Sequence, residues 1–103
     1  MDHLSIPLDH HCSVLRFESP SLFALEKAPG VLSHPNKETK KSSRQRTLLN
    51  AEYHYQEEFY HWKNNQGEIQ KLFLIHRLDS ATSGIILTST SLEIAGQIKS
   101  LFF

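Results

Sequence analysis

The sequence contains one cysteine, no net charge and no long apolar run, and each of these absences excludes a class of protein. Cys12 has no partner for an internal disulfide and cannot belong to a cysteine-rich zinc site. Eleven Lys and Arg residues balance eleven Asp and Glu residues, so the chain as a whole does not attract nucleic acid or a membrane. No stretch approaches the roughly 20 apolar residues that span a bilayer. Any surface that binds a charged partner must therefore be local.

The beginning of the chain, Met1–Leu4, has neither the basic nor the apolar region of a signal peptide. Together with the lone cysteine, this favours a location in the cytoplasm and no contact with a membrane. A chain of 103 residues is long enough for one hydrophobic core and too short for two. We therefore expect a single domain.

Four short apolar or β-prone runs predict strands. The first two are joined by a tight connection at Ser19-Pro20-Ser21, and the last is apolar enough to predict a strand that is covered on both faces. The four predicted strands are Ser13–Phe17, Leu22–Lys27, Lys71–Ile75 and Gly84–Thr88.

Two helices are predicted. Apolar residues at steps of three and four predict the first, from about Thr47 to His61. Thr90 and Glu93 have the spacing of a capping box, which predicts a second helix from Ser91. The first apolar face comprises Leu48, Ala51, Tyr55, Phe59 and Trp62; the second comprises Ile94, Ala95, Ile98, Leu101 and Phe102.

These elements predict a mixed α/β (α+β) fold, in which two helices pack on a mainly antiparallel sheet of short strands. The second helix reaches the end of the sequence without a glycine cap, a proline or a polar tail. We therefore expect this chain to be a truncated form of a larger domain.

The loop between the last two predicted strands holds the best candidate for chemistry. Asp79 lies there beside Arg77 and the hydroxyl groups of Ser80, Thr82 and Ser83. A neighbouring cation and hydrogen bonds favour the ionised form of a carboxylate, which suits Asp79 to the role of nucleophile or base. From these residues alone, the commoner explanation is a turn in which the side chains of Asp79 and Thr82 bond the local backbone.

The string His76–Leu87 resembles the catalytic motif of RluA/RluD-type RNA pseudouridine synthases, HRLDxxTSG followed by an apolar strand, and every fixed position matches. A weaker similarity lies upstream, where Leu25–Pro35 resembles the family's Lys-Pro-x-Gly strand and turn with its following His-Pro. Ala28 replaces the usual first proline there. The segment Thr47–Ala51 is also similar, so the resemblance extends from about Ser21 to the end of the chain.

The resemblance implies that Asp79 attacks the ribose of a target uridine in rRNA or tRNA, or abstracts a proton from it. The glycosidic bond at N1 breaks, the uracil turns, and C5 is joined to C1′. It also implies that Arg77 fills the gap left by the flipped uridine. No metal, nucleotide or redox cofactor is expected. The residues expected to shape the active-site loop are His76, Thr82, Ser83 and Gly84.

By the same resemblance, residues 19–103 form the N-terminal part of a catalytic domain and residues 1–18 lead into its first strand. The family's later motifs supply a tyrosine near the target base and a basic partner for the catalytic aspartate, and they would follow Phe103. Two interpretations remain: a truncated synthase, or a catalytically inactive remnant or RNA-binding fragment of such an enzyme.

Several other residue groups have two explanations each. Residues 37–46 are basic, which suits RNA phosphates, although a solvated loop is commoner. Lys27 and His34 border the cleft by resemblance, or are an ordinary strand-end lysine and loop histidine. His10, His11, His54 and His61 suggest a metal, but no spacing of ligands supports one, so no metal site is expected. Tyr53 and Tyr60 remain candidates for base stacking, whereas Tyr55, Phe59 and Trp62 are expected in the core.

Overall fold

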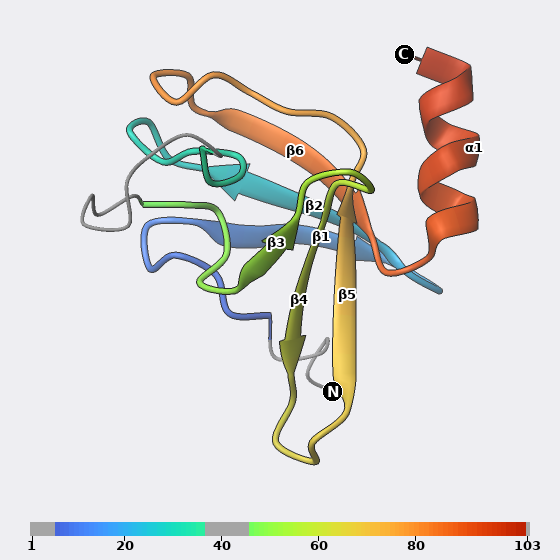
Figure 1. Cartoon of the computed structure of the whole chain (residues 1–103). Coiled ribbons are helices and arrows are strands. Elements are labelled where there is room, and N and C mark those ends of the chain that lie inside the picture. Colours follow the sequence, from blue (N-terminus) through green and yellow to red (C-terminus); the bar gives the residue numbers. More distant parts are fainter. Residues whose placement is uncertain (1–5, 37–45, 103) are drawn as a thin grey trace.

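The computed structural model describes residues 6–36 and 46–102, which form a six-stranded sheet and one helix. The strand order is β1-β2-β6-β5-β4-β3, and every neighbouring pair is antiparallel (Figure 1). The mainly antiparallel sheet expected from the sequence is thus confirmed. The elements are β1 (Ser13–Glu18), β2 (Leu22–Lys27), β3 (Glu52–His54), β4 (Phe59–Lys63), β5 (Ile69–Leu74), β6 (Gly84–Ser89) and α1 (Leu92–Phe102).

All four predicted strands are present as β1, β2, β5 and β6, with ends that differ by no more than two residues. The expectation that β6 is covered on both faces is wrong in part. Ile86 is fully buried, but Ile85 on the opposite face is 51% exposed. The reason is that α1 covers only the end of β6 that lies near Leu87.

The helix predicted for residues 47–61 is absent. Leu48 and Leu49 lie in an irregular buried segment, and β3 and β4 follow as a hairpin. Aromatic residues favour strands, and β4 gains a full ladder with β5, in which Tyr60 lies opposite Leu72. The steps of three and four were therefore a coincidence of spacing, and one helix packs on the sheet instead of two.

The helix α1 begins one residue later than predicted and has a different cap. The amide of Ile94 donates to Oγ of Ser91 at 3.2 Å, so Ser91 is the capping residue and the predicted capping box of Thr90 and Glu93 is not formed. Its buried face is also shorter than expected. Ala95 is buried, but Leu101 and Phe102 are 74% and 72% exposed.

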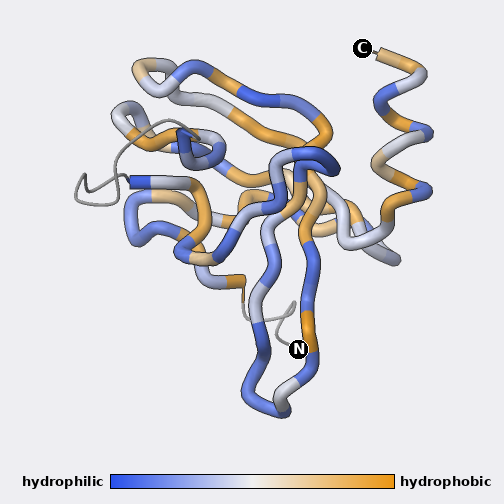
Figure 2. Tube along the Cα trace, viewed as in Figure 1, coloured by the Kyte–Doolittle hydropathy of each residue, from blue (hydrophilic) through white to orange (hydrophobic). Residues whose placement is uncertain are grey.

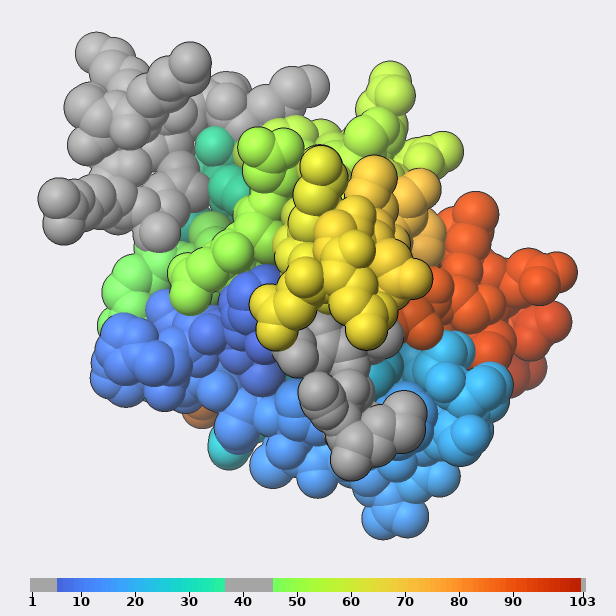
Figure 3. Space-filling view, turned by 90° about the horizontal axis from the view of Figure 1, so that it is seen from below, coloured from blue at the N-terminus to red at the C-terminus, as the bar shows by residue number. Residues whose placement is uncertain are grey.

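The sheet has a core on each face. The larger core lies under irregular segments of residues 6–12, 28–34 and 46–51, and the smaller one lies under α1. Figure 3 shows the N-terminal segment (blue) and α1 (red) at opposite sides of the molecule. The far end of the β4–β5 hairpin is mostly hydrophilic (Figure 2). No helix among the described residues is long and apolar enough to cross a membrane.

Pairing between β2 and β6 places two distant loops at one end of the sheet. Lys27, the last residue of β2, lies opposite Gly84, the first residue of β6. The segment that leaves β2 and the loop that enters β6 therefore emerge side by side. These are the two segments that the sequence motifs single out.

Candidate active site

A hollow of about 400 Å³ opens where these two loops meet. One wall comes from the segment after β2 and the other from the loop before β6. The hollow has a size typical of small-molecule sites, which measure about 300–1,000 Å³. Its lining residues are Leu32, Ser33, His34, Asn36, Arg77, Leu78, Asp79 and Ser80.

Lys27 is hydrogen-bonded to both walls of the hollow. Its side chain is fully buried, and Nζ donates to the carbonyl oxygens of Ala28 at 3.1 Å, Val31 at 2.6 Å and Ser80 at 3.2 Å. These bonds use all three ammonium protons, which a buried charge requires. The amide of Gly30 adds a second link to the same Ser80 oxygen, at 2.6 Å. The lysine is thus buried between the two loops, unlike an ordinary solvated lysine at a strand end, and it does not itself line the hollow.

Ser33 fixes the residue immediately before Asp79. Its Oγ donates to the carbonyl oxygen of Leu78 at 2.8 Å and accepts from the amide of Leu78 at 2.9 Å. The main-chain oxygen of Ser33 is in turn held by the buried hydroxyl of Tyr60, at 2.6 Å. The backbone that presents Asp79 is therefore anchored to the core of the sheet.

Asp79 is exposed at the hollow, and its carboxylate makes no hydrogen bond or ion pair with any described residue. The turn at this point is made by the main chain: the amide of Thr82 donates to the carbonyl oxygen of Asp79 at 3.0 Å. The expected turn built from the Asp79 and Thr82 side chains is therefore not formed. The pKa of Lys27 is lowered, mainly by burial; the charge of Asp79 opposes this effect without reversing it.

Arg77 lines the same hollow, and no hydrogen bond or ion pair joins it to Asp79. Its Nη1 lies 3.1 Å from Nε2 of His34. The ring of His34 stacks on Tyr53, with ring centroids 5.0 Å apart and planes 8° from parallel. The sequence left His34 open between a cleft residue and an ordinary loop histidine, and the structure places it in the cleft.

The other motif residues lie around this loop without lining the hollow. His76 is partly buried, its Nε2 accepts the amide of Leu87 at 3.1 Å, and burial lowers its pKa. Gly84 has φ +153°, and a Cβ there would lie 3.2 Å from Cδ1 of Leu78. The side chains of Thr82 and Ser83 are exposed.

The aromatic residues of β3, β4 and the turn between them are not all buried as expected. Tyr60 is fully buried and Phe59 is 6% exposed, whereas Tyr55 and Trp62 are only partly buried. Tyr53 is partly buried behind His34. Tyr60 therefore belongs to the core, and Tyr53 supports the wall of the hollow.

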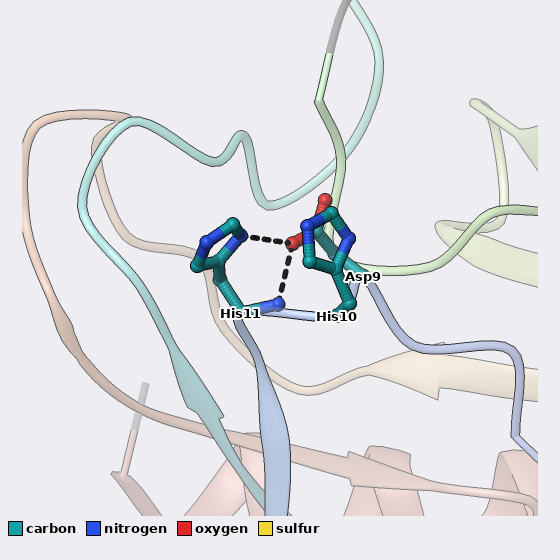
Figure 4. Close-up of side chains that lie close together, drawn as sticks. All are labelled: Asp9, His10 and His11. Carbon is teal, nitrogen blue, oxygen red and sulfur yellow. Dashed lines mark hydrogen bonds and ion pairs between the residues drawn. The ribbon is translucent and has the colours of Figure 1, made fainter.

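A second cluster lies away from the hollow. Asp9, His10 and His11 bring one potential ligand atom each to within 4.8 Å of one another (Figure 4). Arg46 already occupies the carboxylate, with Nη2 2.7 Å from Oδ1 and Nε 3.2 Å from Oδ2 of Asp9, and it also contacts Nδ1 of His11. This hydrogen bonding with Arg46, aided by the His11 amide, lowers the pKa of Asp9 to about 2. A metal ion would have to displace the guanidinium, so this geometry fits an ion pair better than a metal centre.

Ser33 was not singled out by the sequence, and Tyr60 was considered only as a candidate for base stacking. Ser33 lies inside the upstream segment that resembles the family, and that position was its only signal. Tyr60 contacts Ser33 across 27 residues of sequence, which no local pattern reveals. Most of the predicted basic loop, residues 37–45, lies outside the described residues.

The family model for RNA pseudouridylate synthases matches residues 21–102. The chain belongs to the RNA pseudouridylate synthase family. Neither the curated proteins nor the solved structures contain a match. Within this RluA-type family, the matched region covers both loops of the hollow, five of the six strands and the helix. Residues 1–20, which include β1, lie before the match.

Proposed function

We propose that this chain is an RNA pseudouridine synthase that isomerises specific uridines of rRNA or tRNA, with Asp79 as the catalytic residue. The observation that carries the proposal is an exposed carboxylate with no partner among the described residues, presented at a hollow by a backbone that Ser33 and Lys27 anchor. A nucleophile or base needs a free carboxylate at a fixed position, and this arrangement supplies both.

In this proposal the carboxylate of Asp79 carries the chemistry. Asp79 attacks C1′ of the target ribose, or removes a ribose proton, and the electrons of the glycosidic bond pass to N1 of uracil. The uracil then turns, and C5 forms a bond to C1′ as the bond between C1′ and the Asp79 oxygen breaks or, in the second route, as the proton that Asp79 removed returns to the ribose. The proton on C5 then leaves, and N1 takes up a proton.

Arg77 is proposed to enter the RNA where the target uridine leaves it. Extrusion of a base from its stack costs a few kcal/mol, and a planar guanidinium that stacks in its place offsets part of that cost. Arg77 is exposed and lines the hollow two residues before Asp79, so one loop presents both groups to the same nucleotide.

The test is to incubate the purified chain with total RNA that lacks the modification and to map pseudouridine. The chain should form pseudouridine, and Asp79→Asn should reduce the product to background. Glu57→Gln is the matched control, because it neutralises an exposed carboxylate that does not line the hollow. Wild-type product no greater than that of Asp79→Asn would contradict the proposal. RNA binding without product would favour the alternative, a non-catalytic RNA-binding module.

A further inference from the structure

We propose that His34 is a positioning residue for Arg77: it holds the guanidinium at the rim of the hollow and keeps it from pairing with Asp79. This inference rests on the proposed function, because it concerns how the proposed base-flipping arginine is prepared for RNA. It assigns a specific task to a residue that the motif leaves without one.

The contacts of His34 define its protonation state. An arginine side chain only donates hydrogen bonds, so Nε2 of His34 must accept from Nη1 of Arg77, 3.1 Å away. Nδ1 lies 2.9 Å from the carbonyl oxygen of Pro35, which only accepts, so Nδ1 carries the proton. His34 is therefore neutral, and its proton is on Nδ1.

The orientation of the ring is fixed from the core outward. The His34 ring stacks on Tyr53, and the edge of Tyr55 meets it with planes at 88°. Tyr53 packs against the fully buried Tyr60, with centroids 4.9 Å apart. Each ring restricts the rotation of the next one. The position of Nε2 of His34 is therefore fixed, and so is the position of the Arg77 guanidinium that it binds.

The contact between His34 and Arg77 has two effects: it leaves Asp79 unpaired, and it orders the arginine side chain. Arg77 is two residues from Asp79, and an arginine near a carboxylate tends to form a charge-assisted pair with it. Its bond to His34 competes with that pair and leaves the carboxylate available. The bond also restricts a flexible side chain before RNA arrives, which lowers the ordering cost at the moment of insertion. Only Nη1 is engaged by His34, so other N–H groups of the guanidinium remain for RNA.

The first test does not depend on activity. ¹⁵N NMR of the free protein should show His34 with the proton on Nδ1, and it should show slowed rotation of the Arg77 guanidinium. His34→Phe preserves a ring on Tyr53 but removes the acceptor, so the Arg77 rotation should become fast. His54→Phe is the matched control: His54 also stacks on an aromatic ring, 4.8 Å from Phe59, and should leave Arg77 unchanged. Unchanged Arg77 signals in His34→Phe would overturn the inference.

The second test uses RNA that carries a fluorescent base analogue beside the target uridine. His34→Phe should lower kcat and the rate of base unstacking about tenfold, the effect of losing one hydrogen bond to a charged group, with little change in KM. His34→Gln should recover much of the loss, since its amide oxygen can accept from Arg77. In the background of Arg77→Ala, His34→Phe should have no further effect, because His34 acts through Arg77.

The outcomes separate this inference from the proposed function. No pseudouridine from the wild-type chain would contradict the proposed function, and the NMR result would still decide whether His34 holds Arg77. Normal kcat in His34→Phe, alongside a loss in Arg77→Ala, would overturn the inference and leave the proposed function standing.

Discussion

Lys27 carries a buried ammonium whose three hydrogen bonds end on main-chain oxygens of both loops at the hollow. A methionine of similar length would keep the apolar stem but remove the ammonium. The Val31 oxygen would lose its donor, while the Ser80 and Ala28 oxygens would keep only the amides of Gly30 and Val31. We therefore expect Lys27→Met to lower the free energy of unfolding by about 3 kcal/mol, measured by urea denaturation. The exposed Lys63→Met is the control and should change it by less than about 0.5 kcal/mol. A similar small change in Lys27→Met would contradict this role.

At the level of single residues, the sequence identified those whose role follows from a short contiguous motif. Arg77 and Asp79 stand in one contiguous string, so their place at the hollow followed from it. Ser33 could not be identified in this way, because its partner Leu78 is 45 residues away. Lys27 was left undecided for a related reason: a lysine at a strand end is usually solvated, and only the pairing of β2 with β6 buries it.

Among the elements, β2 and β6 were predictable and the β3–β4 hairpin was not. β6 is rich in β-branched residues, and β2 is a short run bounded on both sides by segments that contain proline. In residues 47–61 the helical spacing predicted one shared face for residues that lie on opposite faces of the sheet in the hairpin. Phe59 and Trp62 were placed on one helical face, yet Phe59 faces the α1 side of the sheet and Trp62 packs against the core on the other face. The register with β5 decides this, and that register is set by residues beyond the segment.

The start of β6 has a backbone conformation that favours glycine. Gly84 combines φ +153° with a Cβ position 3.2 Å from Cδ1 of Leu78, the residue before Asp79. Gly84→Ala should therefore lower the free energy of unfolding by about 1–3 kcal/mol and shift the proposed catalytic loop. Gly96→Ala is the control, because this exposed helical glycine has open space and alanine there should stabilise α1 by up to about 1 kcal/mol. Urea denaturation of both variants measures the difference, and equal effects of the two substitutions would contradict the argument.

On one face of the sheet, the larger core is covered by segments that are neither helix nor strand. Leu48 and Leu49 are fully buried without belonging to a strand or helix, and isolated bridges join Leu8 to Leu49 and Leu32 to Thr47. Such a cover has no periodicity, because each segment is fixed by contacts with other parts of the chain. Sequence patterns therefore predicted four of the six strands but not the irregular segments that cover the larger core. The upstream wall of the hollow is one of these segments.

Asp9 and Arg46 join two segments of this cover, and their ion pair makes the stability of the whole molecule depend on pH. Hydrogen bonding with Arg46 lowers the pKa of Asp9 from 3.8 to about 2, so the folded state binds this proton less readily than the unfolded state does. The contribution of the pair is thus fully present above pH 3.8 and is lost as the pH falls to about 2. Asp9→Asn should be less stable than the wild type at neutral pH, and urea denaturation should show the two converging across that window.

Glu18→Gln is the matched control for this effect. Glu18 pairs with Arg16, and both side chains are largely exposed, whereas the Asp9 side chain is only 6% exposed. An exposed pair contributes little to stability, so Glu18→Gln should follow the wild-type pH dependence throughout. If Asp9→Asn instead ran parallel to the wild type down to about pH 2, Asp9 would not be the titrating group, despite its lowered pKa. Convergence would show that the segment before β1, which lies outside the family match, stabilises the part of the chain inside it.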